Sequence, residues 1–356
     1  MKRVAVIGAG AAGLAAARHL ISRSQSFQFC VFEQSAQLGG TWVYTEKVGN
    51  DEFGLPIHSS MYKSLRTNLP KEVMGYPDFP IPEQPKSYLP AADILNFLDS
   101  YAVHFNIKKY IKFRHHVQSV RPIPGNMGWE LKVQDLNSGV TSTSNVDAVM
   151  ICNGHYNTPY IPQIPGADAF CGRVLHSHDY REPQAFSGQN VLVIGAGPSG
   201  MDLALEIASC AKQVILSHHN PEPIKTKFPS NVRMAPDVTN IMNDLVNFSD
   251  GSSAKIDTIF YCTGYRYNFP FLDAACGVRI IDNCVEPLYK HLIHIDHPSM
   301  CFIGLPFYVC AFSLFDLQSR FFLEVLDGTL ELPSRELMAA DTAREHTWRR
   351  EQEIFR

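Results

Sequence analysis

The stretch Val4-Ala5-Val6-Ile7-Gly8-Ala9-Gly10-Ala11-Ala12-Gly13 decides the fold. Its first four residues predict a buried strand, which runs directly into the spacing G-x-G-x-x-G. A helical pattern over 14–20 and a second strand over 27–32 complete a strand–helix–strand unit of the dinucleotide-binding kind. In such a turn one glycine permits the bend, one lets the backbone approach a pyrophosphate, and one packs helix on strand. The N–H groups and positive dipole end of the helix N-terminus favour the phosphate charge.

Glu33 closes the second strand about twenty residues after the last glycine, where a carboxylate hydrogen-bonds ribose hydroxyls. Because this carboxylate repels a 2′-phosphate, we expect the first site to take FAD or NAD. The residues assigned to it are Gly8, Ala9, Gly10, Ala11, Ala12, Gly13 and Glu33.

The pattern returns at 191–200, Val-Leu-Val-Ile-Gly-Ala-Gly-Pro-Ser-Gly, with glycines Gly195, Gly197 and Gly200. A helix is expected from Met201 and a strand over 213–216. This strand ends in Ser217, His218 and His219, which offer a hydroxyl and potential cations to a 2′-phosphate. We therefore expect NADP(H) here. One FAD site and one NADPH site predict a flavoprotein in which hydride passes from nicotinamide to flavin.

Composition sets the remaining limits. A chain of 356 residues predicts about two domains, and a net charge of −4 gives no reason to expect nucleic acid. The nine cysteines are scattered without a Cys-x-x-Cys pair, so we expect no metal site, no dithiol centre and a reducing, cytoplasmic setting. The apolar segment 300–315 is too short to span a membrane and predicts a buried strand and turn in a soluble protein. A secreted chain whose signal peptide has been removed would look the same.

Residues 170–180 match F-x-G-x-x-x-H-x-x-x-Y, with Phe170, Gly172, His176 and Tyr180 at the fixed positions. This is a signature of flavin-containing monooxygenases, and the chain resembles that family, in its shorter branch of insects and fungi. Other matching segments are Leu38-Gly39-Gly40-Thr41-Trp42, Thr67-Asn68-Leu69-Pro70-Lys71-Glu72, Phe260-Tyr261-Cys262-Thr263-Gly264-Tyr265 and Leu317-Gln318-Ser319-Arg320. His218 and His219 stand where the family often has an arginine, which weakens the preference for NADPH over NADH.

The resemblance implies contacts to each cofactor. The FAD contacts, beyond the first glycine turn and Glu33, are Gly40, Thr41, Trp42, Asn68, Leu69, Val117 and Gln318. The NADP contacts are Thr67, Asn68, Ser199, Gly200, Met201 and Asp202. Asn68 is the catalytic candidate, as the polar group that holds flavin and nicotinamide in register.

The resemblance also implies the reaction. NADPH reduces FAD, reduced flavin captures O2 as a C4a-hydroperoxide, and a soft nitrogen or sulfur atom attacks the distal oxygen. The expected partners are O2 and a small amine or sulfide, for instance an alkaloid amine oxidised in xenobiotic detoxification. His176 and Tyr180 are interpreted as structural support, and Cys152 and Cys262 as core residues.

We expect an α/β fold of two doubly wound domains, with an NADP domain (166–286) inserted into a split FAD domain (1–165 and 287–356). Three rivals remain: a Baeyer–Villiger monooxygenase, a two-dinucleotide flavin reductase, and a non-enzymatic flavin sensor. A reductase of the disulfide kind needs a cysteine pair that the sequence lacks. A homo-oligomer is compatible with this reading.

Overall fold

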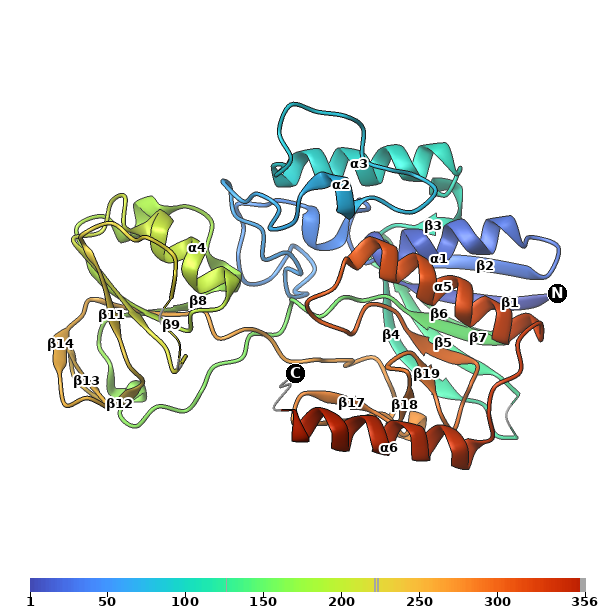
Figure 1. The fold of residues 1–356 in the computed structure, drawn as a ribbon. Helices are drawn as coiled ribbons and strands as arrows, with labels where there is room; N and C mark the ends of the chain where they lie inside the picture. Colours follow the sequence, from blue (N-terminus) through green and yellow to red (C-terminus); the bar gives the residue numbers. More distant parts are fainter. Residues whose placement is uncertain (126, 221, 223, 353–356) are drawn as a thin grey trace. The chain divides into compact units, whose positions relative to one another are not determined.

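The computed structural model describes residues 1–125, 127–220, 222 and 224–352. Two compact units divide the chain (Figure 1). The first unit comprises Met1–Val43, Leu65–His155 and Tyr267–Arg356, and the second comprises Tyr44–Ser64 and Tyr156–Arg266. Each is built around its own largely parallel sheet, as the α/β fold class expected from the sequence requires.

The sheet of the first unit has the order β18-β19-β20-β7-β1-β2-β3. The pairs β1–β2, β1–β7, β2–β3 and β7–β20 are parallel, whereas β18–β19 and β19–β20 are antiparallel. The strands are β1 (Lys2–Ile7), β2 (Phe27–Phe32), β3 (Ile111–Lys112), β7 (Ala148–Ile151), β18 (Leu288–Tyr289), β19 (Ile293–His294) and β20 (Met300–Phe302).

Alternating side chains of β1 supply two different cores. Val4 and Val6 face the helices α1 (Ala11–Ser22), α3 (Ala91–His104) and α5 (Ala311–Asp327), and Figure 1 shows α1 and α5 side by side. Ala5 and Ile7 face an antiparallel sheet of β4 (His115–Pro122), β5 (Trp129–Asp135) and β6 (Thr141–Val146). Both faces of the parallel sheet are therefore covered, which explains the continuous apolar run at its centre.

Further elements complete this unit. They are the helices α2 (Lys71–Met74) and α6 (Arg335–Glu351), the hairpin β16 (Arg279–Ile281) and β17 (Cys284–Glu286), and the 3₁₀ turns η1 (Gly40–Trp42), η2 (Lys108–Tyr110) and η6 (Ala274–Cys276). The apolar segment 300–315 was expected to form a strand and a turn. Its first residues form β20, but its residues from Ala311 onward belong to α5.

The second unit repeats the central arrangement. Its parallel sheet has the order β11-β10-β9-β15-β8, and α4 (Pro198–Ile207) connects β9 to β10 as α1 connects β1 to β2. The strands are β8 (Arg173–His176), β9 (Asn190–Ile194), β10 (Gln213–Ser217), β11 (Val232–Ala235) and β15 (Thr258–Tyr261). A small antiparallel sheet adds β12 (Val238–Met242), β13 (Leu245–Phe248) and β14 (Ser253–Lys255), and the 3₁₀ turns are η3 (Ala167–Ala169), η4 (Ser177–Asp179) and η5 (Pro183–Phe186).

The units differ in extent from the limits expected at 165 and 286. Residues 156–165 belong to the second unit, where Tyr160 N–H donates to the Gly264 carbonyl at 2.9 Å. Residues 267–286 belong to the first unit, because Phe269 and Phe271 enter the core beneath β1. Residues 44–64 form part of the second unit, although they stand far from it in the sequence.

Candidate active site: two dinucleotide turns

The three glycines of the first turn have three distinct environments. Gly8 has φ +102°, and a Cβ there would lie 2.5 Å from the Cys152 carbonyl oxygen. A Cβ on Gly13 would lie 1.9 Å from the Gly8 oxygen, so α1 can pack on β1 only with glycine at this position. A Cβ on Gly10 would meet nothing closer than the Gly40 Cα at 3.6 Å. The middle glycine is therefore free of packing constraints, as close approach by a pyrophosphate requires.

Gly10 is also the N-cap of α1, and no side chain caps this helix end. The first N–H groups of α1 thus form an anion-binding terminus. Beside them, Tyr76 donates its hydroxyl to the Ala11 carbonyl at 2.7 Å, which fixes the first helical turn.

Glu33 is buried at the end of β2, and both of its carboxylate oxygens accept backbone hydrogen bonds. The donors are the N–H groups of Ala9 and Ser35, each at 2.8 Å. A carboxylate has about four acceptor positions, so ribose hydroxyls can still be bound. Glu33 therefore holds the glycine turn in shape as well as presenting an acceptor at its rim.

The segment at Gly39, Gly40 and Trp42 lies directly on this turn. Gly39 N–H donates to the Ala9 carbonyl at 3.0 Å, and both glycines have positive φ, +119° and +55°. Glycine suits this approach, since at φ +55° a Cβ on Gly40 would lie a tight 3.0 Å from the Gly10 Cα. Thr41 and Trp42 follow in η1, and the Trp42 ring packs edge-on against Phe312 at 6.4 Å. The structure thus joins Gly40–Trp42 to the first turn.

Asn68 lies in a loop that is pinned at its base. Thr67 N–H donates to the Leu89 carbonyl at 2.9 Å, and the Thr67 hydroxyl accepts from Leu89 N–H at 3.0 Å. Thr67 is buried and Leu69 half-buried, but the Asn68 side chain is exposed and hydrogen-bonds to nothing else that the structure describes. Its amide is therefore available to a ligand.

Val117 and Gln318 lie deeper in the first unit. Val117 is a buried side chain of β4 in the core beneath β1, so only its backbone can face a ligand. Gln318, on α5, is buried and accepts the Gly304 N–H at 2.9 Å. Its side chain therefore fixes the loop before α5.

The second turn has the same geometry as the first. Gly195 has φ +101°, and its Cβ would lie 2.6 Å from the Cys262 oxygen; a Cβ on Gly200 would lie 1.8 Å from the Gly195 oxygen. A Cβ on Gly197 would meet nothing within 4 Å. Cys262 occupies the place that Cys152 has in the first unit, and burial raises the pKa of both thiols. Both cysteines are thus small packing residues beside the third glycine, as expected.

The helix behind this turn has an open N-terminus. Gly197 is the N-cap of α4 without a side-chain cap, Ser199 is exposed, and Met201 is half-buried. Asp202 accepts a hydrogen bond from the Tyr62 hydroxyl, and burial together with this carboxylate raises the pKa of Tyr62. Asp202 is thus engaged by a side chain from the segment 44–64.

The three residues after β10 are unequal. Ser217 is buried and donates its hydroxyl to the Pro236 carbonyl at 2.7 Å, which uses its donor. His218 is half-buried and accepts the Asn220 N–H at its Nδ1, 3.1 Å away. His219 is exposed, and its Nδ1 lies 3.6 Å from the Asp237 carboxylate.

Signature residues 170–180 build the second unit rather than a reaction centre. Phe170 packs over Gly172, where a Cβ would lie 2.4 Å from the phenylalanine ring. His176 is buried at the end of β8, and its Nδ1 accepts the His178 N–H at 3.1 Å. Burial lowers the pKa of His176 to about 4, so the ring is neutral at pH 7. Tyr180 is buried, and burial together with Glu206 raises its pKa.

A model of the flavin-binding monooxygenase-like family matches residues 1–227 and 220–355. The chain belongs to this family.

Flavin-containing monooxygenase FMO GS-OX5 of Arabidopsis thaliana is 40% identical over 357 residues, covering 95% of this chain and 76% of that protein. The S-allyl-L-cysteine S-oxygenase from Allium sativum has a TM-score of 0.91 at 35% identity, covering 99% of this chain and 83% of that one. Tmm from Pelagibacter sp. strain HTCC7211 has a TM-score of 0.88 at 29% identity, covering 96% and 79%. These relatives confirm the family expected from the sequence, but they do not show its insect and fungal branch.

The rival classes share the fold. Cyclohexanone monooxygenase matches with a TM-score of 0.67 at 14% identity, covering 92% of this chain and 87% of that one. The Bacillus cereus bacillithiol disulfide reductase matches with a TM-score of 0.71 at 16% identity, covering 91% and 99%. Membership of the monooxygenase family establishes a flavoprotein that uses FAD, NADPH and O2 to oxygenate a nucleophilic nitrogen or sulfur atom of a small molecule. Two uncapped helix N-termini behind unobstructed middle glycines fit two such cofactors.

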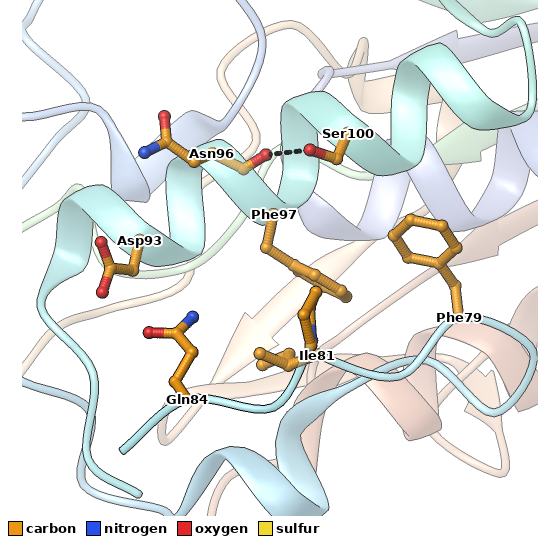
Figure 2. A pocket seen from close by; sticks show the side chains of 8 residues that line it. Phe79, Ile81, Gln84, Asp93, Asn96, Phe97 and Ser100 are labelled. Atoms are coloured by element: carbon orange, nitrogen blue, oxygen red, sulfur yellow. Dashed lines mark hydrogen bonds between the residues drawn. The ribbon is translucent and has the colours of Figure 1, made fainter. Parts of the chain in front are cut away.

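Further observations bear on the limits of this site. No helix in the described ranges is both long and apolar enough to cross a membrane. A cavity of about 220 Å³ on α3, lined by Phe79, Gln84, Asp93, Asn96 and Phe97 among others, includes none of the predicted site residues (Figure 2). It is therefore separate from the candidate site.

The sequence interpretation missed Arg181. Its buried guanidinium donates to a series of backbone carbonyls, those of Thr45, Lys47, Ser59, His178 and Tyr180, at 2.6–3.2 Å. Arg181 thereby ties the segment 44–64 to the second unit. Its position directly after the signature tyrosine was the available signal.

The interpretation also missed Lys225 and Lys227. Both are exposed cations, and Thr226 between them lies beside α4, with its hydroxyl 3.8 Å from the Met201 sulfur. Two lysines soon after a His-His strand end offer further cations to a phosphate.

Proposed function

We propose that the first unit binds FAD, that the second binds NADPH, and that the enzyme oxidises the sulfur of a small thioether. The proposed substrate class is supported by the structural similarity, over 99% of this chain, to an S-allyl-L-cysteine S-oxygenase. The balanced reaction takes thioether, O2, NADPH and H⁺ to sulfoxide, water and NADP⁺. FAD, when bound, supplies the redox chemistry, and the protein supplies binding, orientation and exclusion of water.

The allocation of cofactors rests on charge. Glu33 sets a carboxylate against Ala9 at the first turn, where it favours ribose hydroxyls and repels a 2′-phosphate. The second turn is followed by His218 and by the exposed Lys225 and Lys227, which favour a 2′-phosphate. Loss of NADPH use in Lys225→Ala, with NADH use unchanged, supports this allocation; equal loss with both coenzymes contradicts it.

The proposed substrate is tested with the purified holoenzyme, NADPH and ¹⁸O2. S-allyl-L-cysteine and a tertiary aliphatic amine are supplied separately at equal concentration. We expect one ¹⁸O atom in the sulfoxide and one NADPH consumed per product formed. If the amine is oxidised and the thioether is not, the enzyme catalyses N-oxygenation, which is the other reaction of this class, and not S-oxygenation. NADPH consumption that yields only hydrogen peroxide with both probes refutes the proposed substrate class.

We further propose that the exposed Asn68 amide holds the flavin and nicotinamide rings in register. In Asn68→Ala, FAD content is retained while the hydrogen peroxide released per NADPH rises. Asn96→Ala, which removes an exposed amide from α3, is the matched control with unchanged coupling. Unchanged coupling in Asn68→Ala removes Asn68 from the reaction.

We also propose a cytoplasmic enzyme. The support is that the cysteines of the described chain are free, with several buried in the core. Fractionation of source cells checks the location, and light scattering checks the expected homo-oligomer.

A further inference from the structure

A cluster of metal-ligating side chains lies at the C-terminal helix, on residues that belong to neither glycine turn. Cys284 and Glu286 stand two residues apart on β17 and therefore share a face of the strand. His346, from α6, lies against that face. Its Nε2 is 3.9 Å from the Cys284 sulfur and its Nδ1 is 3.6 Å from a Glu286 carboxylate oxygen. One ligand atom from each residue lies within 4.8 Å of the other two.

The donor set and its burial suit one class of metal. Thiolate, imidazole and carboxylate together are ligands of Zn²⁺, at about 2.0–2.3 Å from the metal in tetrahedral geometry. Ligand atoms around such a centre stand about 3.5 Å apart, so shifts of about 1 Å would close this cluster on an ion. A thiolate and a carboxylate also balance the charge of a divalent cation. Cys284 is buried, whereas Glu286 and His346 are 26% and 15% exposed, which leaves a path for metal and for a water at the fourth position.

The helix that carries His346 has little apolar anchorage. Among the described side chains of α6, Met338 is the one that is buried. The helix packs along β17 and β18 (Figure 1) through polar contacts: Lys290 with Asp341 at 2.6 Å, His291 with Glu345 at 3.0 Å, and the Thr342 hydroxyl with the Leu288 carbonyl at 3.2 Å. Ion pairs near the surface, such as these, contribute little stability. A metal bridging β17 and α6 would hold the helix in place.

We propose that Cys284, Glu286 and His346 form a structural Zn²⁺ site that fastens the C-terminal helix to the FAD-binding unit. The other cysteines do not share this setting. In the part of the chain that the structure describes, no second group of three His, Cys, Asp or Glu side chains converges in this way. No Cys-x-x-Cys pair marks this site, because its ligands come from a hairpin strand and from a helix about sixty residues later.

The test is metal content in the full-length holoenzyme. The protein is stripped with a chelator, dialysed against micromolar ZnCl₂, and analysed by mass spectrometry for zinc per chain. We expect one Zn²⁺ per wild-type chain, and at least tenfold weaker binding in Cys284→Ser and in His346→Ala. Cys171→Ser, which changes an exposed cysteine of the second unit, should bind as the wild type does.

Hydrogen exchange provides a second measurement that does not depend on activity. Zn²⁺ should slow amide exchange in residues 335–351 of the wild type and leave it unchanged in Cys284→Ser. If His346→Ala detaches the helix, Glu286→Gln is the variant to test in its place, because it keeps the size of the side chain. Absence of stoichiometric zinc in the wild type, or zinc that survives loss of Cys284 and of His346, overturns the site and leaves a hydrogen-bonded Cys–His–Glu cluster.

Discussion

Replacing Gly197 by alanine separates the folding role of a dinucleotide turn from its binding role. Gly197 has φ −70° and ψ −176°, a conformation open to alanine, and the new Cβ meets nothing within 4 Å. Because Gly197 is the N-cap of α4, the substitution should lower the free energy of unfolding by about 1 kcal/mol at most. The protein should therefore fold with nearly unchanged thermal stability.

The new methyl group of Gly197→Ala lies where the backbone must approach the pyrophosphate. The methyl group should prevent one charge-assisted hydrogen bond between the N-terminus of α4 and the pyrophosphate. The loss of this bond weakens the binding free energy by about 2 kcal/mol, which corresponds to about 30-fold weaker binding. We expect the NADP⁺ dissociation constant, measured by calorimetry, to rise by about this factor while FAD content stays unchanged. Gly10→Ala is the reciprocal variant: it should lose FAD and keep NADP⁺ affinity.

Gly200→Ala is the contrasting variant. Its Cβ would lie 1.8 Å from the Gly195 oxygen, so α4 must move away from β9 by about 1.5 Å to reach ordinary contact. Such overpacking costs about 3 kcal/mol, and the melting temperature should fall. Gly197→Ala with unchanged NADP⁺ affinity, or Gly200→Ala with unchanged stability, would refute the division of roles among these glycines.

The remaining predictions concern buried polar groups. In Glu33→Gln, one of the two backbone N–H groups that donate to the carboxylate would face an amide NH2 and lose its acceptor. We therefore expect a free energy of unfolding about 2 kcal/mol lower and loss of FAD on gel filtration. Arg181→Lys removes guanidinium donors from buried carbonyls, so cleavage by protease between residues 44 and 64 should accelerate and stability should fall by about 3 kcal/mol. Burial lowers the pKa of His176 and His294 to about 4, from 6.5 when unfolded. The unfolded chain then binds more protons between these values, so the free energy of unfolding should decrease as pH falls from about 6.5 to 4, by about 3 kcal/mol per histidine. Chemical denaturation across this range checks the slope, and His294→Gln should flatten it.

The acid sensitivity has a geometric reason besides burial. His294 Nδ1 accepts the N–H groups of Asp296 and His297, each at 3.1 Å, and His176 Nδ1 accepts that of His178. An acceptor nitrogen must be unprotonated, so charging either ring breaks these bonds. Stability that is flat from pH 6.5 to 4 would contradict both effects.

The sequence predicted the glycine turns because their constraints are local. A Cβ on Gly13 or on Gly200 would meet the oxygen of the glycine five residues earlier, within one strand–helix unit. The charged sequence from 334 onward is typical of a solvated helix, and α6 is largely exposed. Periodicity and turn chemistry are enough for such elements.

The sequence did not predict where the units exchange chain segments. Arg181 contacts carbonyls of residues 45, 47 and 59, well over one hundred positions away, and no periodic pattern encodes such a pairing. Phe269 and Phe271 likewise join the first unit through packing under β1, although their composition does not distinguish them from the preceding strand. Ser217 was expected from its position alone to offer its hydroxyl to a 2′-phosphate, but this hydroxyl donates to the Pro236 carbonyl. Long-range packing decides all three features.

Because the two glycine turns are so similar, the choice between FAD and NADPH must depend on residues outside the turns. Corresponding glycines have φ of +102° and +101°, and their Cβ positions lie 2.5 and 2.6 Å from the carbonyls of Cys152 and Cys262. Two turns this similar bind a pyrophosphate alike, so they do not distinguish FAD from NADPH. The difference begins one strand later, where Glu33 closes β2 with a carboxylate that also braces the turn, whereas β10 ends at Ser217 without an acid. Placing an acid after β10, as in His218→Glu, should therefore weaken NADPH more than NADH, which lacks the 2′-phosphate that the carboxylate repels.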